Sequence, residues 1–270
     1  MTYEFWFYTD FEEGTECDFG ITQEGVDGEV SLFDVQFGDV WICSGQSNMG
    51  WTMSGIFNAD EELDRLANEF PNFRLMKVKL MTSDTPQDDL MDEDFGIWAT
   101  TADRNYARSF SAVCLLTASY MAEILGKDKP FGLIHTAWGG TRIEPWFYNQ
   151  QECDIDDNVD ENNPQQSNKY LYNAMIHPLV RSGIKGAMWY QGESNAGWNR
   201  DKYQCAIKQL ISDWKMEFQH YGTLADPDHM PFGFVQLSTI FQDQNPGIPV
   251  IRWHQTADYG YVPNEILPVS

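Results

Sequence analysis

The sequence predicts an α/β fold in which a mostly parallel sheet is covered by helices on both faces. Two patterns predict it: short apolar runs typical of buried strands recur from residue 39 onward, and segments with helical periodicity separate them. A strand that is followed by a helix usually returns to the same sheet in parallel. Hydrophobic residues form 42% of the 270 residues, which is enough for a sizeable core.

Residues 1–38 differ from the rest of the chain, because they carry strand and turn signals without helical periodicity. The segment EVSLFDVQF (29–37) partly alternates apolar and polar side chains, and glycine-rich turns surround it. We expect residues 1–38 to be the C-terminal part of a β-rich domain, and residues 39–270 to form the α/β domain.

Five apolar runs predict the strands of the sheet. Each is short and follows a turn signal or a polar stretch, as in a strand buried on both faces. The predicted strands are residues 40–43, 73–78, 131–136, 186–190 and 232–237.

Helical periodicity fills the gaps between these strands. Apolar residues recur at helical spacing over 106–124, with Gly126 as a stop signal, and again over 203–218. A shorter periodic segment, 172–179, contains a proline that distorts or ends it. Residues 149–169 are acidic and lack periodicity, which predicts a surface loop.

The charge of the chain limits its partners. Acidic residues outnumber basic ones 41 to 17, giving a formal net charge of -24. Such a surface repels nucleic acid and anionic membranes. No run of about 18 apolar residues occurs, so no membrane span is predicted. An anionic substrate would need a local cation, because the field of the whole chain opposes its approach.

The cysteines and acidic residues predict no metal site. No CxxC pair occurs among the five cysteines, and residues 154–162 alternate Asp and Asn like a calcium loop but lack its glycine and glutamate. Cys43 and Cys114 stand in apolar runs, which predicts buried thiols. Cys153 and Cys205 could form a disulfide, and the odd count leaves at least one cysteine unpaired.

The segment SGQSNM follows the first strand and offers a nucleophile. In a parallel sheet, ligands bind beyond the carboxyl ends of the strands. Ser47 at this strand-to-helix turn can attack a carbonyl if a base takes its proton. Met49 replaces the second glycine of a Gly-x-Ser-x-Gly elbow, so the segment is not that motif. A helix cap or serine turn is the alternative interpretation.

Two later strand ends could donate to an oxyanion. The segment AWGGTRIEPW contains Gly139 and Gly140, whose backbone N–H groups can approach a ligand closely. The segment WYQGESNA contains the amides of Gln191 and Asn195. Ordinary turn chemistry is the alternative for both.

The order DVW, GQSNM, WGGT, WYQGESN resembles the successive blocks of the sialate O-acetylesterase family. Residues 251–264 (IRWHQTADYGYVPN) are also similar to the animal members, and the resemblance covers roughly residues 30 to 268. It implies an SGNH-hydrolase fold, a three-layer flavodoxin-like arrangement. It also implies a serine esterase that removes O-acetyl groups from sialic acids without metal or cofactor.

The resemblance implies Ser47 as the nucleophile that carries the acetyl group. It implies an oxyanion hole built from the Ser47 backbone N–H, one glycine of the pair and one amide. We prefer Gly139 and Gln191, while Gly140 and Asn195 remain open.

Four residues are candidates for substrate binding. Trp138 could offer an apolar wall to a sugar face. Arg142 and Arg252 could meet a substrate carboxylate. Glu193 follows the glycine turn of the third segment. Core packing or structural ion pairing is the alternative for each.

The resemblance also implies a catalytic acid and histidine from an Asp…His-Pro segment that would follow residue 270. We therefore expect the α/β domain to be incomplete at its C-terminus, and this chain to be a weak esterase or an inactive one. A catalytically silent sugar-binding module and an acetyl esterase for another polysaccharide remain alternatives. The family implies a secreted or lysosomal protein, although neither a signal peptide nor an N-glycosylation sequon is visible.

Overall fold

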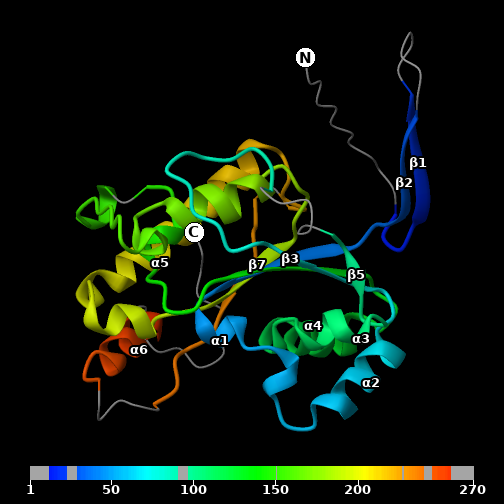
Figure 1. The fold of residues 1–270 in the computed structure, drawn as a ribbon, viewed down its shortest axis with the longest axis horizontal. Coiled ribbons are helices and arrows are strands. Elements are labelled where there is room, and N and C mark those ends of the chain that lie inside the picture. Colours follow the sequence, from blue (N-terminus) through cyan, green and yellow to red (C-terminus); the bar gives the residue numbers. More distant parts are fainter. Residues whose placement is uncertain are drawn as a thin grey trace.

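The protein has a six-stranded sheet at its centre, with helices on both faces (Figure 1). The structure is a computed structural model that describes residues 12–22, 29–90, 97–149, 151–226, 228–239 and 245–256. The strand order is β5-β4-β6-β3-β7-β8; the pairings among β4, β6, β3, β7 and β8 are parallel, and β5 runs antiparallel to β4. The predicted α/β fold with a mostly parallel sheet is confirmed.

The five predicted strands are confirmed within a few residues. The sequence does not predict β5, because two residues are too few to show a period. The strands of the sheet are β3 (Asp39–Gly45), β4 (Phe73–Lys77), β5 (Ala99–Thr100), β6 (Phe131–Ala137), β7 (Gly186–Tyr190) and β8 (Phe232–Phe234).

The helices form the two outer layers of the fold (Figure 1). On one side lie α1 (Ser47–Gly50), α2 (Ala59–Glu69), α3 (Arg104–Arg108) and α4 (Ala112–Leu125). On the other side lie α5 (Tyr203–His220) and α6 (Ile248–Thr256). Among the helices that the structure describes, none is both long and apolar enough to span a bilayer.

The pleat of β3 divides its side chains between two cores. Trp41 and Cys43 join the core beneath α4, while Ile42 joins the core beneath α5. Successive side chains of a strand point to opposite faces, so a strand covered on both faces must be apolar throughout. This explains why the strands read as unbroken apolar runs in the sequence.

The predicted helix over 106–124 is two helices, α3 and α4. The chain breaks at Ser109–Ser111, and the Ser111 hydroxyl accepts the N–H of Cys114 at 3.2 Å as an N-cap. The predicted 203–218 helix is confirmed as α5. The predicted 172–179 segment is a π turn followed by a 3₁₀ turn that contains the proline.

Residues 12–38 contain an antiparallel pair of strands outside the main sheet. β1 (Glu16–Thr22) pairs with β2 (Glu29–Gln36), and Figure 1 shows this ribbon standing off the α/β layers. The strand predicted over 29–37 is confirmed as β2. That residues 1–38 belong to a β-rich domain stays a prediction.

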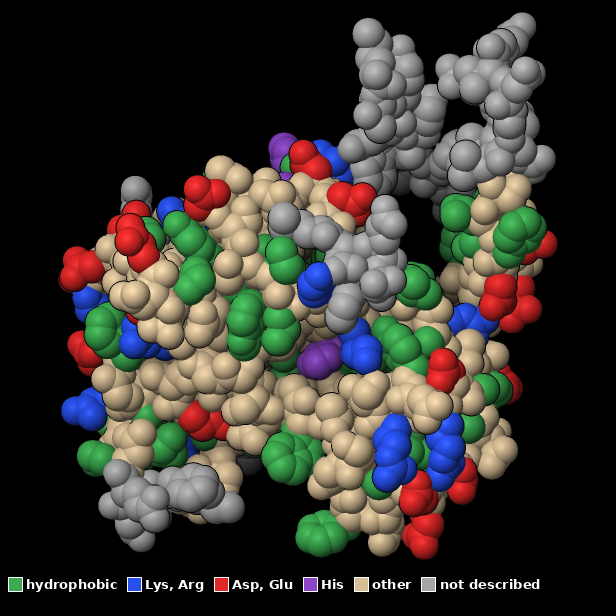
Figure 2. Space-filling view, viewed as in Figure 1, with side chains coloured by type: hydrophobic (Ala, Val, Ile, Leu, Met, Phe, Trp, Pro, Cys, Tyr) green, Lys and Arg blue, Asp and Glu red, His purple; other side chains and the backbone are tan. Residues whose placement is uncertain are grey.

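Several surface cations of the protein face carboxylates. Figure 2 shows basic and acidic side chains side by side over α2 and α3. Arg104 and Arg108 contact Asp60 there at 3.0 and 2.6 Å. The two guanidinium groups lower the pKa of the Asp60 carboxyl, first through their hydrogen bonds and then through their charge.

Two disulfides link the sheet and the acidic loop to helices. Cys43 on β3 is bonded to Cys114 on α4, so the prediction of two buried thiols is wrong. The strand packs directly on that helix, and the Cα atoms lie 5.8 Å apart, within bridging range. The predicted Cys153–Cys205 bond is confirmed, and Cys17 is unpaired.

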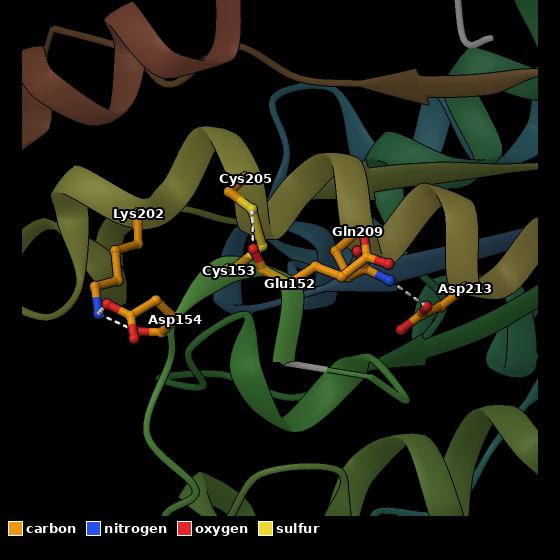
Figure 3. The surroundings of a disulfide bond; sticks show 7 residues. All are labelled: Glu152, Cys153, Asp154, Lys202, Cys205, Gln209 and Asp213. Atoms are coloured by element: carbon orange, nitrogen blue, oxygen red, sulfur yellow. Dashed lines mark hydrogen bonds and ion pairs between the residues drawn. A yellow bond between two sulfur atoms is a disulfide. The ribbon is translucent and has the colours of Figure 1, made fainter.

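The loop over 149–169 is fixed against α5. Figure 3 shows Cys153 of the loop at Cys205 of the helix, and Asp154 beside Lys202. The backbone N–H of Asn149 donates to Asp213 of α5 at 2.7 Å. Two single 3₁₀ turns, η3 (Gln151–Cys153) and η4 (Pro164–Gln166), are its regular structure in the described residues, which confirms the predicted loop.

Candidate active site

Ser47 lies at the carboxyl end of the central strand β3, where α1 begins. Its side chain is exposed, whereas Met49 two residues later is fully buried and anchors the short helix to the core. A serine held in this way presents its hydroxyl to solvent from a fixed backbone, which is what a nucleophile requires.

Gln46, which the sequence interpretation passed over, joins two of the predicted segments. Its side chain is buried, and its Oε1 accepts the backbone N–H groups of Gly192 at 3.4 Å and Ser194 at 3.2 Å. The loop after β7 is therefore fastened to the loop that carries Ser47. A polar residue directly before a candidate nucleophile was the available signal.

Gly139 lies beside Ser47, as the sequence predicts for one glycine of the pair. A Cβ atom on Gly139 would lie 3.5 Å from the Cβ of Ser47, and both residues line one pocket of about 610 Å³. The backbone N–H groups of Ser47 and Gly139 donate to no protein group in the part of the chain that the structure describes. These two donors remain available to an oxyanion.

Gly140 has a different environment. It adopts a φ of +77°, a Cβ there would meet open space, and its carbonyl accepts the side-chain amide of Gln166 at 2.7 Å. This glycine supplies the turn that returns the chain after Gly139, because a positive φ favours glycine. Its role as an alternative oxyanion donor stays a prediction.

Gln191 and Asn195 are both fully buried rather than open to the crevice. The Gln191 amide donates to the Thr141 carbonyl at 3.2 Å and to Oδ1 of Asn195 at 2.7 Å. The Gln191 Oε1 accepts from the Tyr203 hydroxyl at 3.0 Å. Its polar atoms are thus engaged in holding the loops together.

The Asn195 amide is engaged in the same network. It donates to both carboxylate oxygens of Glu144 at 3.2 and 3.0 Å, while its Oδ1 accepts the Ile143 N–H at 2.9 Å. In this arrangement neither amide reaches Ser47, contrary to the expectation that these side chains point into the crevice. An oxyanion role for either stays a prediction, and their observed partners are structural.

Glu193 reaches the nucleophile segment through Asn48. The Asn48 amide donates to Oε1 of Glu193 at 2.5 Å, and Glu193 Oε2 is buried without a hydrogen-bond partner in the described residues. Glu193 is therefore hydrogen-bonded to the residue that follows Ser47 in the chain. Its predicted role in substrate binding stays a prediction.

The other predicted substrate-binding residues lie apart from the Ser47 pocket. The guanidinium of Arg142 stacks over Trp198 at 4.0 Å, and that of Arg252 donates to the Leu237 carbonyl. Trp138 is half-buried and packs against the core beneath α5. None of the three predicted residues is among the described residues that line the pocket.

Three residues that the sequence interpretation missed line the pocket instead. Lys77 and Lys79 come from the end of β4, and His135 comes from β6, opposite Lys77 in the sheet register. Ligands bind beyond the carboxyl ends of parallel strands, and this rule applies to β4 as it does to the other strands of the sheet. The sequence therefore contained a signal for Lys77 and Lys79. Burial lowers the pKa of His135 to about 4, with a further contribution from Lys77.

Two of the alternating carboxylates of residues 154–162 have protein partners. Asp154 pairs with Lys202, and Asp160 accepts the N–H groups of Asn162 and Asn163 at 3.1 and 3.0 Å. Among the residues that the structure describes, no group of three or more potential metal ligands occurs.

Comparison with known proteins gives one consistent set of relatives. Residues 37–264 match the family described as carbohydrate esterase, sialic acid-specific acetylesterase. The chain is 40% identical over 276 residues to the sialate O-acetylesterase of Mus musculus (88% of this chain, 50% of that protein). It is 39% identical over 260 residues to that of Homo sapiens (92% and 49%). It thus spans about half the length of the curated relatives it matches.

A solved structure supports the same relationship. The fold is similar to that of a carbohydrate acetylesterase from Xanthomonas citri, with a TM-score of 0.68 and 30% sequence identity. The similarity covers 84% of this chain and 49% of that one.

Proposed function

The chain belongs to the carbohydrate esterase family of sialic acid-specific acetylesterases, and from that membership we propose that it removes O-acetyl groups from sialic acids through an acetyl-enzyme on Ser47. The observation that carries the proposal is the position of Ser47, exposed at the end of the central strand and next to Gly139. The proposed nucleophile and the glycine proposed as an oxyanion donor line one pocket there.

The proposed reaction has two steps. The Ser47 hydroxyl adds to the acetyl carbonyl as a base takes its proton, and the tetrahedral intermediate expels the sugar oxygen, which is protonated as it leaves. Water then attacks the acetyl-enzyme, and acetate and free Ser47 are released. The N–H groups of Ser47 and Gly139 stabilise both oxyanions, and one such donor contributes about 10² to 10³ in rate.

His135 is a poor candidate for the base. It lines the pocket with Ser47, but its pKa of about 4 lies far below neutral pH. A general base works best when its pKa lies near the working pH. We therefore assign the proton transfer to no residue that the structure describes.

A sugar-binding module is the second candidate function. It is favoured by the same observation, since the pocket has oxyanion donors but no described base of suitable pKa. An acetyl esterase for another acetylated polysaccharide would share the chemistry on Ser47 and differ in the sugar. Both alternatives are separated from the proposal by one experiment.

The experiment compares acetate release by the parent chain, Ser47→Ala and the control Ser182→Ala. Ser182 is exposed on a turn after the 3₁₀ segment η6 (His177–Leu179). On O-acetylated sialic acid, Ser47→Ala should lose the acetate release that the parent shows above the uncatalysed rate, since the nucleophile is removed, and Ser182→Ala should keep it. A parent that releases acetate above the uncatalysed rate and a Ser47→Ala variant that releases it equally fast would refute the nucleophile. Binding of the sugar without any acetate release would favour the sugar-binding module. Faster acetate release from another acetylated polysaccharide would favour an esterase for that polysaccharide.

We further propose that the chain works in an oxidising compartment, secreted or lysosomal. Two disulfides in one chain support this, because such bonds rarely persist in the cytosol. Thiol labelling of the denatured protein from its native source should detect one free cysteine, Cys17. Five labelled cysteines would contradict it.

A further inference from the structure

We infer that Lys77, with Lys79 and His135 beside it, binds the carboxylate of an anionic sugar while Ser47 attacks an acetyl ester of that sugar. The inference rests on the proposed function and deepens it, because it names the groups that select an acidic sugar over a neutral one. These groups come from β6, which pairs with the strand that leads to Ser47, and from the end of β4, which pairs with β6 on its other side.

The first observation is that cation and nucleophile share one pocket. Lys77, Lys79 and His135 line it together with Ser47 and Gly139. Its volume of about 610 Å³ lies in the range of small-molecule sites. A single sugar could therefore contact the lysines and Ser47 at the same time.

The second observation is the sign of the charge. The chain carries a net charge of -24, yet the described residues that line this pocket include two lysines and no carboxylate. An approaching anion is repelled by the molecule as a whole and attracted locally at this site. A neutral sugar would gain nothing from that local field.

The third observation is how Lys77 is held. Its ammonium donates to the Ser109 hydroxyl at 2.9 Å and lies 4.5 Å from the centre of the Tyr106 ring. Its backbone N–H donates to the Tyr106 hydroxyl at 2.9 Å. The side chain is therefore positioned before any ligand arrives, which lowers the entropic cost of binding.

Lys77 also has unused capacity. An ammonium has three donors, and the Ser109 hydroxyl takes one. Within the described ranges no carboxylate lies at ion-pair distance from Lys77, whereas Arg104, Arg108 and Lys127 each have such a partner. Burial lowers the pKa of the Lys77 ammonium, so an anion at this position would offset its desolvation.

The fourth observation is a ring nitrogen of His135 that lacks a hydrogen-bond partner among the described residues. This nitrogen, Nε2, is buried. A buried polar atom without a partner is costly and is rare in folded proteins. The ring lies opposite Lys77 in the sheet register, and no described group takes up this nitrogen.

The two arginines that the sequence favoured for this task are engaged elsewhere. Arg142 stacks on Trp198, and Arg252 donates to the Leu237 carbonyl. The end of β4 therefore provides the cations that an acidic substrate requires at Ser47.

The test measures carboxylate preference by binding, in the Ser47→Ala background so that no turnover occurs. Calorimetric titration compares sialic acid with its carboxyl methyl ester, which removes the charge and keeps the ring. The Ser47→Ala protein with Lys77 intact, which is the parent in this test, should bind the acid about tenfold or more tightly than the ester, as expected of a charged hydrogen bond. Lys77→Gln should reduce this ratio to near one, and the preference of the parent should weaken as salt is added.

Two variants control the result. Lys127→Gln removes a cation that pairs with Glu69 outside the pocket, and it should keep the parental preference. Lys77→Arg keeps the charge and should retain most of the preference. Lys77→Arg therefore reports on the inference even if Lys77→Gln does not fold.

Failure of the inference and failure of the proposed function are distinguishable. Suppose that the protein with Ser47 intact releases acetate. If its Ser47→Ala form binds acid and ester alike, or if Lys77→Gln in that form keeps the same ratio, the inference is overturned and the esterase proposal stands. If a Lys77-dependent preference is found but no acetate is released, the binding role of Lys77 holds and the esterase proposal fails.

Discussion

Gly45 and Tyr190 approach each other so closely that a Cβ atom on Gly45 would lie 2.2 Å from the Tyr190 carbonyl oxygen. The two residues are paired at the carboxyl ends of β3 and β7. Gly45 also has a φ of +137°, a conformation that side chains rarely adopt. This contact sets the spacing between the Ser47 loop and the loop that follows β7.

Gly45→Ala should therefore destabilise the fold. The new methyl group would both clash with the Tyr190 backbone and force an unfavourable φ, together costing about 2–4 kcal/mol. Urea unfolding at neutral pH measures the loss. Gly197→Ala is the matched control, because a Cβ there meets open space and it should change stability by less than about 1 kcal/mol. Equal stability of the two variants would contradict the prediction.

Gln191→Ala should act on stability rather than on catalysis alone. The change leaves Tyr203 and Asn195 without their buried partner, which costs about 1–3 kcal/mol in unfolding free energy. An oxyanion donor would instead lower kcat by about 10² to 10³ while leaving KM and stability unchanged. Unfolding and acetate-release assays on the same preparation separate the two roles. A fall in kcat without a loss of stability would restore Gln191 to the oxyanion hole.

Removal of the Cys43–Cys114 bond should destabilise the sheet. The bond closes a loop with a sequence separation of 71 residues and ties β3 to α4 next to the nucleophile segment. The paired replacement Cys43→Ala with Cys114→Ala should lower the unfolding free energy by about 2–4 kcal/mol. Cys17→Ala serves as control, since that cysteine is unpaired and half-buried. A denaturation midpoint equal to that of the control would contradict the expectation.

Acidification should weaken the fold through His135. Burial and the nearby charge of Lys77 lower the pKa of His135 from 6.5 to about 4, so below pH 6.5 the unfolded chain binds a proton that the folded chain excludes. The stabilisation is thus complete above pH 6.5 and is lost as the pH falls towards 4. Between pH 7.5 and 5 the parent should lose about 1–2 kcal/mol more than His135→Gln. Parallel pH profiles of the two proteins, followed by urea unfolding, would disprove the assignment.

The sequence alone determines which segments form the sheet and where the proposed nucleophile lies. A strand buried on both faces must be apolar throughout, so β3 and β6 can be predicted from the sequence alone. The carboxyl ends of parallel strands meet at one edge, so Ser47 and Gly139 are expected to be close, and they are.

Local pattern fails where a distant contact decides the structure. The periodicity over 106–124 continues through Ser109–Ser111, yet the helix breaks there because Ser111 bridges to Thr52 and the Ala112 N–H donates to the Trp51 carbonyl. The sequence also gives no clear sign of α2, whose buried apolar residues are few among acidic ones.

The direction of polar side chains at the strand ends is decided by tertiary structure. Gln191 and Asn195 turn inward because Thr141 and Glu144, about 50 residues earlier in the chain, and Tyr203 on α5 offer them buried partners. The order of the strands places β6 beside β3 and β4 beyond β6, and so brings Lys77 and His135 into the pocket of Ser47. Strand order and buried hydrogen bonds depend on the packing of whole layers, which local residue patterns do not encode.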